Sequence, residues 1–202
     1  MDEGALIQDA LDGDLNAFNV LVLHYQDMAY NVAYRIMGEP DAADDAAQEG
    51  FISAYQKLHQ YRGGSFKAWL LRIITNHCYD ELRRRQRQPA VPLTPHLPDG
   101  ETLEDPYWIE DQGVTPEEHS EQAELQAAIQ HCINALDPKF RIILVLVDVE
   151  GLDYQTAAEA AGTKMGTVKS RLARARERVQ DCLQLFWELL PEPFRHNTEE
   201  MK

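Results

Sequence analysis

Apolar residues recur at three- and four-residue spacing through most of the chain, which is the period of a helix with one buried face. The first half contains two long examples, at residues 16–37 and 41–58. A third follows a loop and runs from residue 66 to about residue 87. Asp14 and Ser65 stand where side chains can cap the first and the third of these helices.

The second half repeats the helical pattern. A stripe of apolar residues runs from 125 to 136, and Asp137-Pro138 ends one helix and opens the next. Residues 140–149 are apolar on nearly every side, as in the central helix of a small bundle. No segment shows the alternation of a strand, so we predict an all-α fold.

A proline-rich, acidic segment separates the two halves and predicts a linker between two small helical domains. Its helix-breaking residues are Pro89, Pro92, Pro95, Pro98, Pro106 and Pro116. We therefore expect one domain over residues 1–88, a linker over 89–120, a second domain over 121–190 and a tail over 191–202.

A helix-turn-helix is predicted near the end of the second domain. Asp153 can cap a short helix over 154–161, Gly162 supplies the turn, and a second helix begins near residues 165–167. Two helices joined by a short glycine-containing turn are typical of proteins that read DNA in the major groove.

The second helix of this motif has a small, polar and basic outer face. At 100° per residue, its apolar positions turn inward at Val168, Leu172, Ala175 and Val179. Arg174 on the outer face can donate two hydrogen bonds to a guanine, and Ala173 can touch a thymine methyl. Arg171 and Arg176 lie on the flanks, where they suit phosphates. The alternative is a solvated basic face on an ordinary helix pair.

The charge distribution changes the meaning of the net charge. The formal net charge of −15 argues against a free-standing DNA-binding protein. Residues 88–138, however, hold eleven acidic residues and no Lys or Arg, whereas basic residues concentrate at 83–87 and 164–178. Two basic clusters in an acidic chain indicate two separate DNA contacts within a larger assembly.

The cysteines and the N-terminus add further expectations. Cys78, Cys132 and Cys182 lie about fifty residues apart, which is neither a zinc spacing nor a disulfide framework. Cys132 falls on an apolar stripe, so we interpret it as a core residue. We expect no metal and no cofactor. An acidic start and no apolar stretch of membrane-spanning length predict a cytoplasmic protein.

Residues 151–178 resemble region 4 of the extracytoplasmic-function (ECF) group of sigma factors, most specifically at Gly166–Leu172. The resemblance implies a helix that reads the minus-35 promoter element. It assigns that role to Lys169, Ser170, Arg171, Ala173 and Arg174.

Residues 43–51 resemble the acidic helix of sigma region 2. The resemblance implies that this helix docks on the clamp helices of the largest subunit of RNA polymerase. The residues that would do so are Asp44, Asp45, Gln48 and Glu49. Acidic side chains suit a basic partner, although each one alone also fits a solvated face. The implied partners are core polymerase, including the flap of its second-largest subunit, promoter DNA and an anti-sigma factor.

Residues 61–76 resemble the segment that opens and reads the minus-10 element. Trp69 and Asn76 are seven residues apart and share one helix face, where an aromatic ring can stack on an unpaired base and an amide can bond a flipped base. Trp69 fits the apolar core equally well. The predicted minus-10 contacts are Tyr61, Arg62, Gly63, Ser65, Trp69, Asn76, Arg83 and Arg84.

The predicted function is therefore that of an ECF sigma factor, which binds core polymerase and directs promoter-specific initiation without catalysing a reaction itself. The chain departs from the family pattern at Ala42, Ala157, Ala161 and Lys164. Two rivals remain. One is a stand-alone helix-turn-helix regulator that binds duplex DNA without polymerase, and the other is an adaptor that docks proteins and not DNA.

Overall fold

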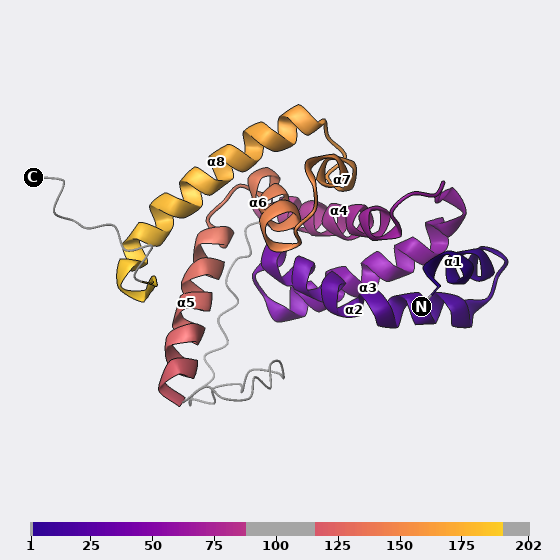
Figure 1. Cartoon of the computed structure of the whole chain (residues 1–202), viewed down its shortest axis with the longest axis horizontal. Coiled ribbons are helices and arrows are strands. Elements are labelled where there is room, and N and C mark those ends of the chain that lie inside the picture. The colour runs from indigo at the N-terminus through magenta and orange to yellow at the C-terminus, as the bar shows by residue number, and fades with distance from the viewer. Residues whose placement is uncertain (1, 88–115, 192–202) are drawn as a thin grey trace, which may run out of the picture.

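The computed structural model describes residues 2–87 and 116–191, and every regular element in these ranges is a helix (Figure 1). Most of the predicted linker and nearly all of the predicted tail lie outside the described residues. The N-terminal unit contains α1 (Glu3–Leu11), α2 (Leu15–Met37), α3 (Pro40–Lys57), a 3-10 turn (Leu58–Gln60) and α4 (Phe66–Arg87). The C-terminal unit contains α5 (Pro116–Asn134), α6 (Pro138–Leu144), a π-helical turn (Val145–Val149), α7 (Tyr154–Ala160), α8 (Met165–Leu183) and a 3-10 turn (Gln184–Leu189).

The predicted caps of the N-terminal unit are confirmed. The carboxylate of Asp14 accepts hydrogen bonds from the backbone amides of Asn16 and Ala17, at 2.8 and 3.4 Å. The hydroxyl of Ser65 accepts one from the amide of Ala68 at 3.1 Å. Both bonds satisfy amides that have no partner within their own helix, which is why α2 and α4 begin where the sequence predicts.

Small residues on α3 allow it to lie close to its neighbours. Its buried positions are five alanines and a glycine, Ala42, Ala43, Ala46, Ala47, Gly50 and Ala54. A Cβ atom at Gly50 would come within 2.7 Å of Cγ1 of Ile74 on α4. Ala42, where the family pattern has an acidic residue, is also buried, so an alanine suits the local packing.

The C-terminal unit starts earlier than predicted. Helix α5 begins at Pro116, inside the segment expected as linker, because proline is favourable in the first turn of a helix although it breaks a helix interior. The apolar run at 140–149 forms α6 and the π-helical turn, and its residues from Phe140 to Leu146 are buried. The predicted central helix is therefore confirmed.

The two units share one continuous hydrophobic core. The guanidinium of Arg141 is buried with 7% exposure and donates hydrogen bonds to the carbonyls of Ile36 in α2, and of Asn134 and Leu136 at the end of α5. It thus serves carbonyls that two helix ends leave without a partner. Because Ile36 belongs to the other unit, a single side chain connects both units.

A second polar contact joins α2 to α5. Arg35 donates to the side-chain oxygens of Gln130, at 3.1 Å, and of Gln126, at 3.2 Å. The amide of Gln130, which is 7% exposed, donates in return to the backbone carbonyl of Arg35 at 3.2 Å. These reciprocal bonds satisfy the buried amide and hold one face of α5 against α2.

Helix α7 packs against α4 through small side chains. Ala157, Ala158 and Ala160 are buried, and the hydroxyl of Thr75 on α4, which donates to the carbonyl of Leu71 at 2.8 Å, lies 3.4 Å from the carbonyl of Ala160. A larger aliphatic residue at position 157 would hold the helices apart. Alanine at this departure from the family pattern therefore fits a close contact between the two units.

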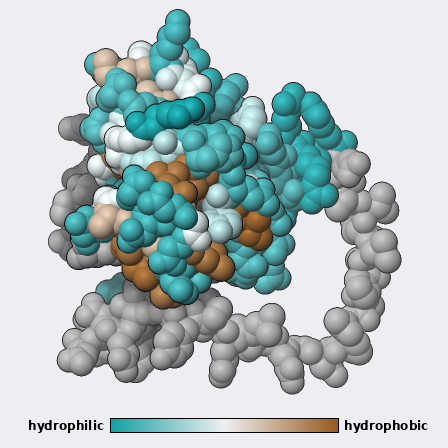
Figure 2. All heavy atoms as spheres, turned by 90° about the vertical axis from the view of Figure 1, so that its right-hand side faces the viewer, coloured by the Kyte–Doolittle hydropathy of each residue, from teal (hydrophilic) through white to brown (hydrophobic). Residues whose placement is uncertain are grey.

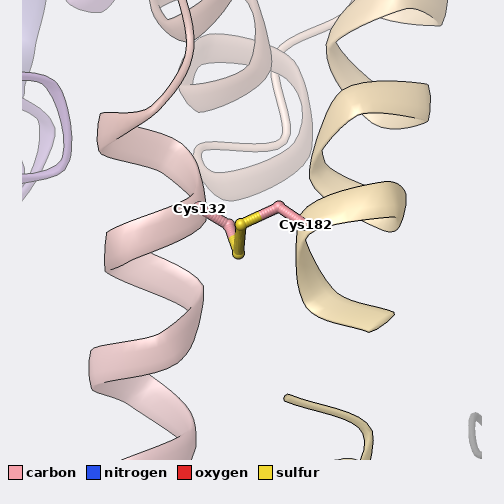
Figure 3. The surroundings of a disulfide bond; sticks show 2 residues. All are labelled: Cys132 and Cys182. Atoms are coloured by element: carbon pink, nitrogen blue, oxygen red, sulfur yellow. A yellow bond between two sulfur atoms is a disulfide. The ribbon is translucent and has the colours of Figure 1, made fainter. Parts of the chain in front are cut away.

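Two of the cysteines form a disulfide, which corrects the sequence-based interpretation. Cys132 is buried, as expected, but it is bonded to Cys182 and joins α5 to the end of α8 (Figure 3). Their Cα atoms are 5.6 Å apart although fifty residues separate them. Spacing along the chain could not predict this pair, because the packing of α5 against α8 brings the two cysteines together.

The surface on the side of α1 and the α3–α4 connection is largely hydrophilic, with hydrophobic side chains gathered in its middle (Figure 2). Leu11 and Leu15, which flank the α1–α2 turn, are 40% and 52% exposed. Across the residues that the structure describes, no helix combines the length and the apolar character needed to cross a bilayer.

Candidate nucleic-acid interface

The helix-turn-helix forms as predicted. Oδ1 of Asp153 accepts hydrogen bonds from the amides of Gln155 and Thr156, at 2.9 and 3.0 Å, and its Oδ2 accepts from the Thr156 hydroxyl at 2.6 Å. These bonds favour the carboxylate, so the pKa of Asp153 is lowered, with the Thr156 side chain as the largest cause. Gly162 turns the chain with a φ of +58°, where glycine is favoured.

Helix α8 presents the predicted outer face. Lys169, Ser170, Ala173 and Arg174 are exposed, while Val168, Leu172 and Ala175 are buried against the unit. Arg171, on the flank, is partly buried. Among the described residues, Arg174 is exposed and forms no ion pair, so its guanidinium is available for an external acceptor.

Two flanking arginines have acidic partners within the chain. Arg176 donates to both carboxylate oxygens of Asp148, at 2.9 and 2.6 Å. Arg178 donates to Asp137 at 3.3 Å, and its guanidinium lies 4.7 Å from the centre of the Phe140 ring. In this arrangement a phosphate would therefore have to compete with the carboxylate of Asp148 for the donors of Arg176.

An aromatic cluster surrounds Trp69 at the start of α4. The rings of Tyr61 and Phe66 lie 5.5 and 5.4 Å from it, measured between ring centres. Trp69 is partly buried, so it packs in this cluster and still keeps an accessible part. The two interpretations of Trp69, core and stacking surface, are thus compatible.

The loop before α4 combines exposure with local order. Arg62, Gly63 and Ser65 are exposed, and the Tyr61 hydroxyl donates to the carbonyl of Gly64 at 2.7 Å. Burial, and then the carboxylate of Glu3, raise the pKa of Tyr61, so the phenol stays a neutral donor. The loop therefore has a defined shape beside Trp69.

Asn76 lies further along α4 with its side chain exposed. Arg83 is exposed near the end of the same helix, where Arg83, Arg84, Arg87 and Asp80 line a surface hollow. Arg84 is held by Glu81, with Nε to Oε2 at 2.7 Å and Nη2 to Oε1 at 2.9 Å. Hydrogen bonds from Arg84 and then from Arg85 lower the pKa of Glu81 to about 2. The basic cluster is thus partly neutralised from within.

The predicted polymerase contacts lie together on the exposed face of α3. Asp44, Asp45, Gln48 and Glu49 are all exposed. The amide of Gln48 donates to Oδ2 of Asp44 at 2.7 Å, one helical turn away. The alanine face of α3 is buried on the opposite side, so this acidic face is free for a partner.

One cavity brings the two predicted DNA-reading surfaces together. Asn76 and Arg171 both line it, with Tyr79 from α4 and Lys139 and Ile142 from α6. Sequence patterns missed this juxtaposition, as well as the buried Arg141 and the cysteine pair, because each depends on packing between helices that lie far apart in the sequence. Within the described ranges, no cluster of three or more His, Cys, Asp or Glu side chains is arranged to hold a metal.

Comparisons with known proteins match both units. A model of sigma-70 region 2 matches residues 21–88, and one of sigma-70 region 4 matches residues 126–179. The chain is 36% identical to the ECF sigma factor SigE of Mycolicibacterium smegmatis, over 83% of this chain and 62% of that protein, which is less than two thirds of its length. It is 36% identical to the sigma-H factor of Pseudomonas aeruginosa and 34% identical to the ECF sigma factor SigW of Bacillus subtilis. These matches cover 89% and 88% of this chain, and 92% and 95% of the respective relatives.

Solved structures agree with these matches. The sigma factor RpoE of Bartonella quintana, solved with the anti-sigma factor NepR, aligns with a TM-score of 0.62 at 25% identity, over 85% of this chain and 99% of that one. CnrH, solved with the cytosolic domain of CnrY, shares the fold with a TM-score of 0.64 at 23% identity, over 90% and 96% of the two chains. The chain therefore belongs to the sigma-70 family, as an RNA polymerase sigma factor of the ECF group.

Proposed function

We propose that this sigma factor reads the minus-35 element with the exposed face of α8. The observation that carries the proposal is the row of Lys169, Ser170, Ala173 and Arg174, which stands outward from a capped helix-turn-helix. Arg174 is positioned to bond a guanine edge and Ala173 to contact a thymine methyl. Arg171 supplies a phosphate contact on the flank.

The minus-10 element is assigned to α4 and the loop before it. The aromatic surface of Tyr61 and Trp69 offers a stacking platform for an unpaired base. Arg62, Gly63 and Ser65 border it, and Asn76 offers an amide to a base edge. Arg83 and Arg84, near the C-terminal end of α4, bind phosphates of the DNA backbone. Binding of the unstacked bases to this surface offsets the free-energy cost of unstacking them, which is a few kcal/mol for each base step.

The acidic face of α3 is assigned to the clamp helices of the largest polymerase subunit, and the C-terminal unit to the flap of the second-largest. Asp44, Asp45, Gln48 and Glu49 give α3 electrostatic complementarity to a basic coiled coil. An anti-sigma factor is a further proposed partner, since the RpoE relative was solved with one. All these partners place the protein in the cytoplasm.

Promoter binding requires the two units to separate. Elements centred roughly 25 base pairs apart lie on the order of 85 Å apart along B-DNA. Asn76 and Arg171, in contrast, line one cavity in this arrangement. The closed arrangement therefore cannot contact both elements at once, and binding to polymerase must replace the contacts between α2 and α5 and between α4 and α7.

Run-off transcription with purified core polymerase tests the proposal. We expect promoter-specific transcripts that depend on this protein, and a loss of about tenfold for Arg174→Ala, the lower range for one bidentate base contact. Arg178→Ala, which removes the same charge one turn further along α8, is the matched control and should retain most activity. Duplex binding without polymerase would favour the stand-alone regulator, and an unchanged Arg174→Ala would favour the adaptor.

A further inference from the structure

The disulfide between Cys132 and Cys182 involves none of the individual residues assigned above to promoter DNA or to the clamp helices. Cys132 is 1% exposed on α5, and Cys182 is partly buried on the last turn of α8 (Figure 3). The ring of His131, next to Cys132, packs edge-on against Phe186 at 5.7 Å. The bond therefore fastens two helix ends and the turn that follows α8.

The ring closed by this bond contains the whole DNA-reading motif. Fifty residues separate the two cysteines, and α6, the π-helical turn, α7 and nearly all of α8 lie between them. A cross-link stabilises the segment that it encloses, mainly by restricting the unfolded chain. The disulfide therefore stabilises the helix-turn-helix rather than the N-terminal unit.

The bond leaves the DNA-reading face untouched. Cys182 is eight residues beyond Arg174, which is about 12 Å along the helix axis. Neither cysteine therefore blocks Lys169, Ser170 or Arg174 in either thiol state. A change of thiol state alters the stability of α8 and leaves its contact surface in place.

A lasting structural disulfide is unusual where this protein is proposed to work. DNA and polymerase are in a reducing compartment, where disulfides are rare and those found are typically transient and redox-sensing. We propose that Cys132 and Cys182 are a reversible dithiol–disulfide pair whose oxidation stabilises the promoter-reading helix-turn-helix. The regulatory meaning rests on the proposed function, whereas the chemistry of the pair does not.

The exchange reaction balances with a low-molecular-weight disulfide as oxidant. The more accessible Cys182 thiolate attacks that disulfide, forms a mixed disulfide and releases one small thiolate. The Cys132 thiolate then attacks Sγ of Cys182 and expels the second small thiolate. Two protein thiols lose their protons and two electrons, and the small disulfide becomes two small thiols. A small dithiol reverses both steps.

The third cysteine is not a competing partner. Cys78 is fully buried in α4, and burial raises its pKa to about 12. Thiolates are the reactive species in exchange, so Cys78 stays inert while the chain is folded. It therefore provides a matched control within the same protein.

The test equilibrates the full chain in glutathione disulfide or in reduced glutathione and then measures thiols and stability. In glutathione disulfide we expect loss of two alkylatable thiols and an intramolecular bond between Cys132 and Cys182, identified by peptide mass. Reduction should lower the Tm by about 5 °C or more and lower the amide-exchange protection of α6–α8 at least about tenfold, with a smaller change in α2–α3.

The variants separate the proposal from general destabilisation. Cys132→Ser and Cys182→Ser should each show the reduced stability in both buffers, whereas Cys78→Ser should keep the redox response. Holoenzyme assembled from oxidised protein should retain run-off activity after heating between the two midpoints, and reduced protein should lose it. No bond in glutathione disulfide, or equal stability in both states, would overturn the proposal. These two readouts need neither DNA nor polymerase, so they remain decisive even if the proposed promoter function fails.

Discussion

Asn76 is poorly suited to its position in a helix, although its side chain is well suited to bind a base. Asparagine has a weaker helix propensity than alanine, yet Asn76 lies in the middle of α4 with its side chain exposed. Its amide forms no hydrogen bond to any other described residue, so a structural role does not account for it. The proposed contact with a base would account for it.

Asn76→Ala should therefore impair melting more than initial binding. Alanine favours the helix, so loss of folding would not explain a defect. We expect about tenfold less reactivity of unpaired thymines to permanganate at the minus-10 element, with closed-complex affinity changed less than about twofold, as for one lost base contact. Gln56→Ala, on the exposed surface of α3, is the control. An equal loss in both complexes would count against the flipped-base role.

Some side-chain partners were predicted from the sequence and others were missed, for a common reason. Asp14, Ser65 and Asp153 cap helices as predicted, because capping depends on neighbours within three residues. Arg176 was assigned to phosphate, but it binds Asp148, twenty-eight residues away. Side-chain partners at that separation are decided by how the helices pack.

Helix α3 packs against the rest of the protein with one face and presents the proposed polymerase-binding residues on the opposite face. Alanines and Gly50 pack inward, and four polar residues that include Asp45 stand outward. A helix with such a small-residue face relies on its neighbours for stability, and its outward face can change charge at little cost in stability.

Asp45→Lys should weaken binding to core polymerase by reversing charge on this outward face. We expect about tenfold weaker affinity at roughly 0.1 M salt and a smaller effect at high salt, because exposed charges are screened. Binding is measured by competition for core polymerase against a labelled sigma factor. Asp27→Lys, which makes the same change on the exposed surface of α2, should have little effect. Equal losses from the two variants would remove the specific role of α3.

The C-terminal unit combines a small core with a covalent cross-link. A ring of about fifty residues corresponds to roughly 4 kcal/mol in the chain-entropy model of disulfides. That amount is comparable to the stability that the apolar residues of the C-terminal unit alone would supply once its contacts with the N-terminal unit are lost. The thiol state is therefore expected to decide whether this element folds robustly.

On the scale of the whole molecule, the −15 charge fits a subunit whose DNA affinity depends on a larger assembly. Basic residues on α4 and α8 are partly paired with acidic ones, as Arg84 is with Glu81 and Arg176 with Asp148. Non-specific DNA binding depends on free positive surface. The isolated protein should therefore bind DNA weakly, and polymerase supplies the remaining affinity.

Arg35→Ala should shift the molecule toward separated units. It removes the bonds from Arg35 to Gln126 and Gln130, at about 0.5–1.5 kcal/mol each, so the closed population should fall about five- to 150-fold relative to the open one. Energy transfer between dyes on α2 and α8 measures the change, with Lys57→Ala on the exposed end of α3 as the control. Unchanged transfer, together with unchanged small-angle scattering, would show that this contact does not hold the units together.

The sequence by itself determined the helices other than α1, the caps at Asp14, Ser65 and Asp153, the helix-turn-helix and the outward faces of α3 and α8. All of these follow from periodicity and from contacts within a few residues. Only the tertiary structure decided that Arg141 bridges the units, that Cys132 meets Cys182, and that Asn76 and Arg171 line one cavity. Each of these joins residues from different helices, and helix periodicity fixes which face a residue occupies but not which distant face it meets.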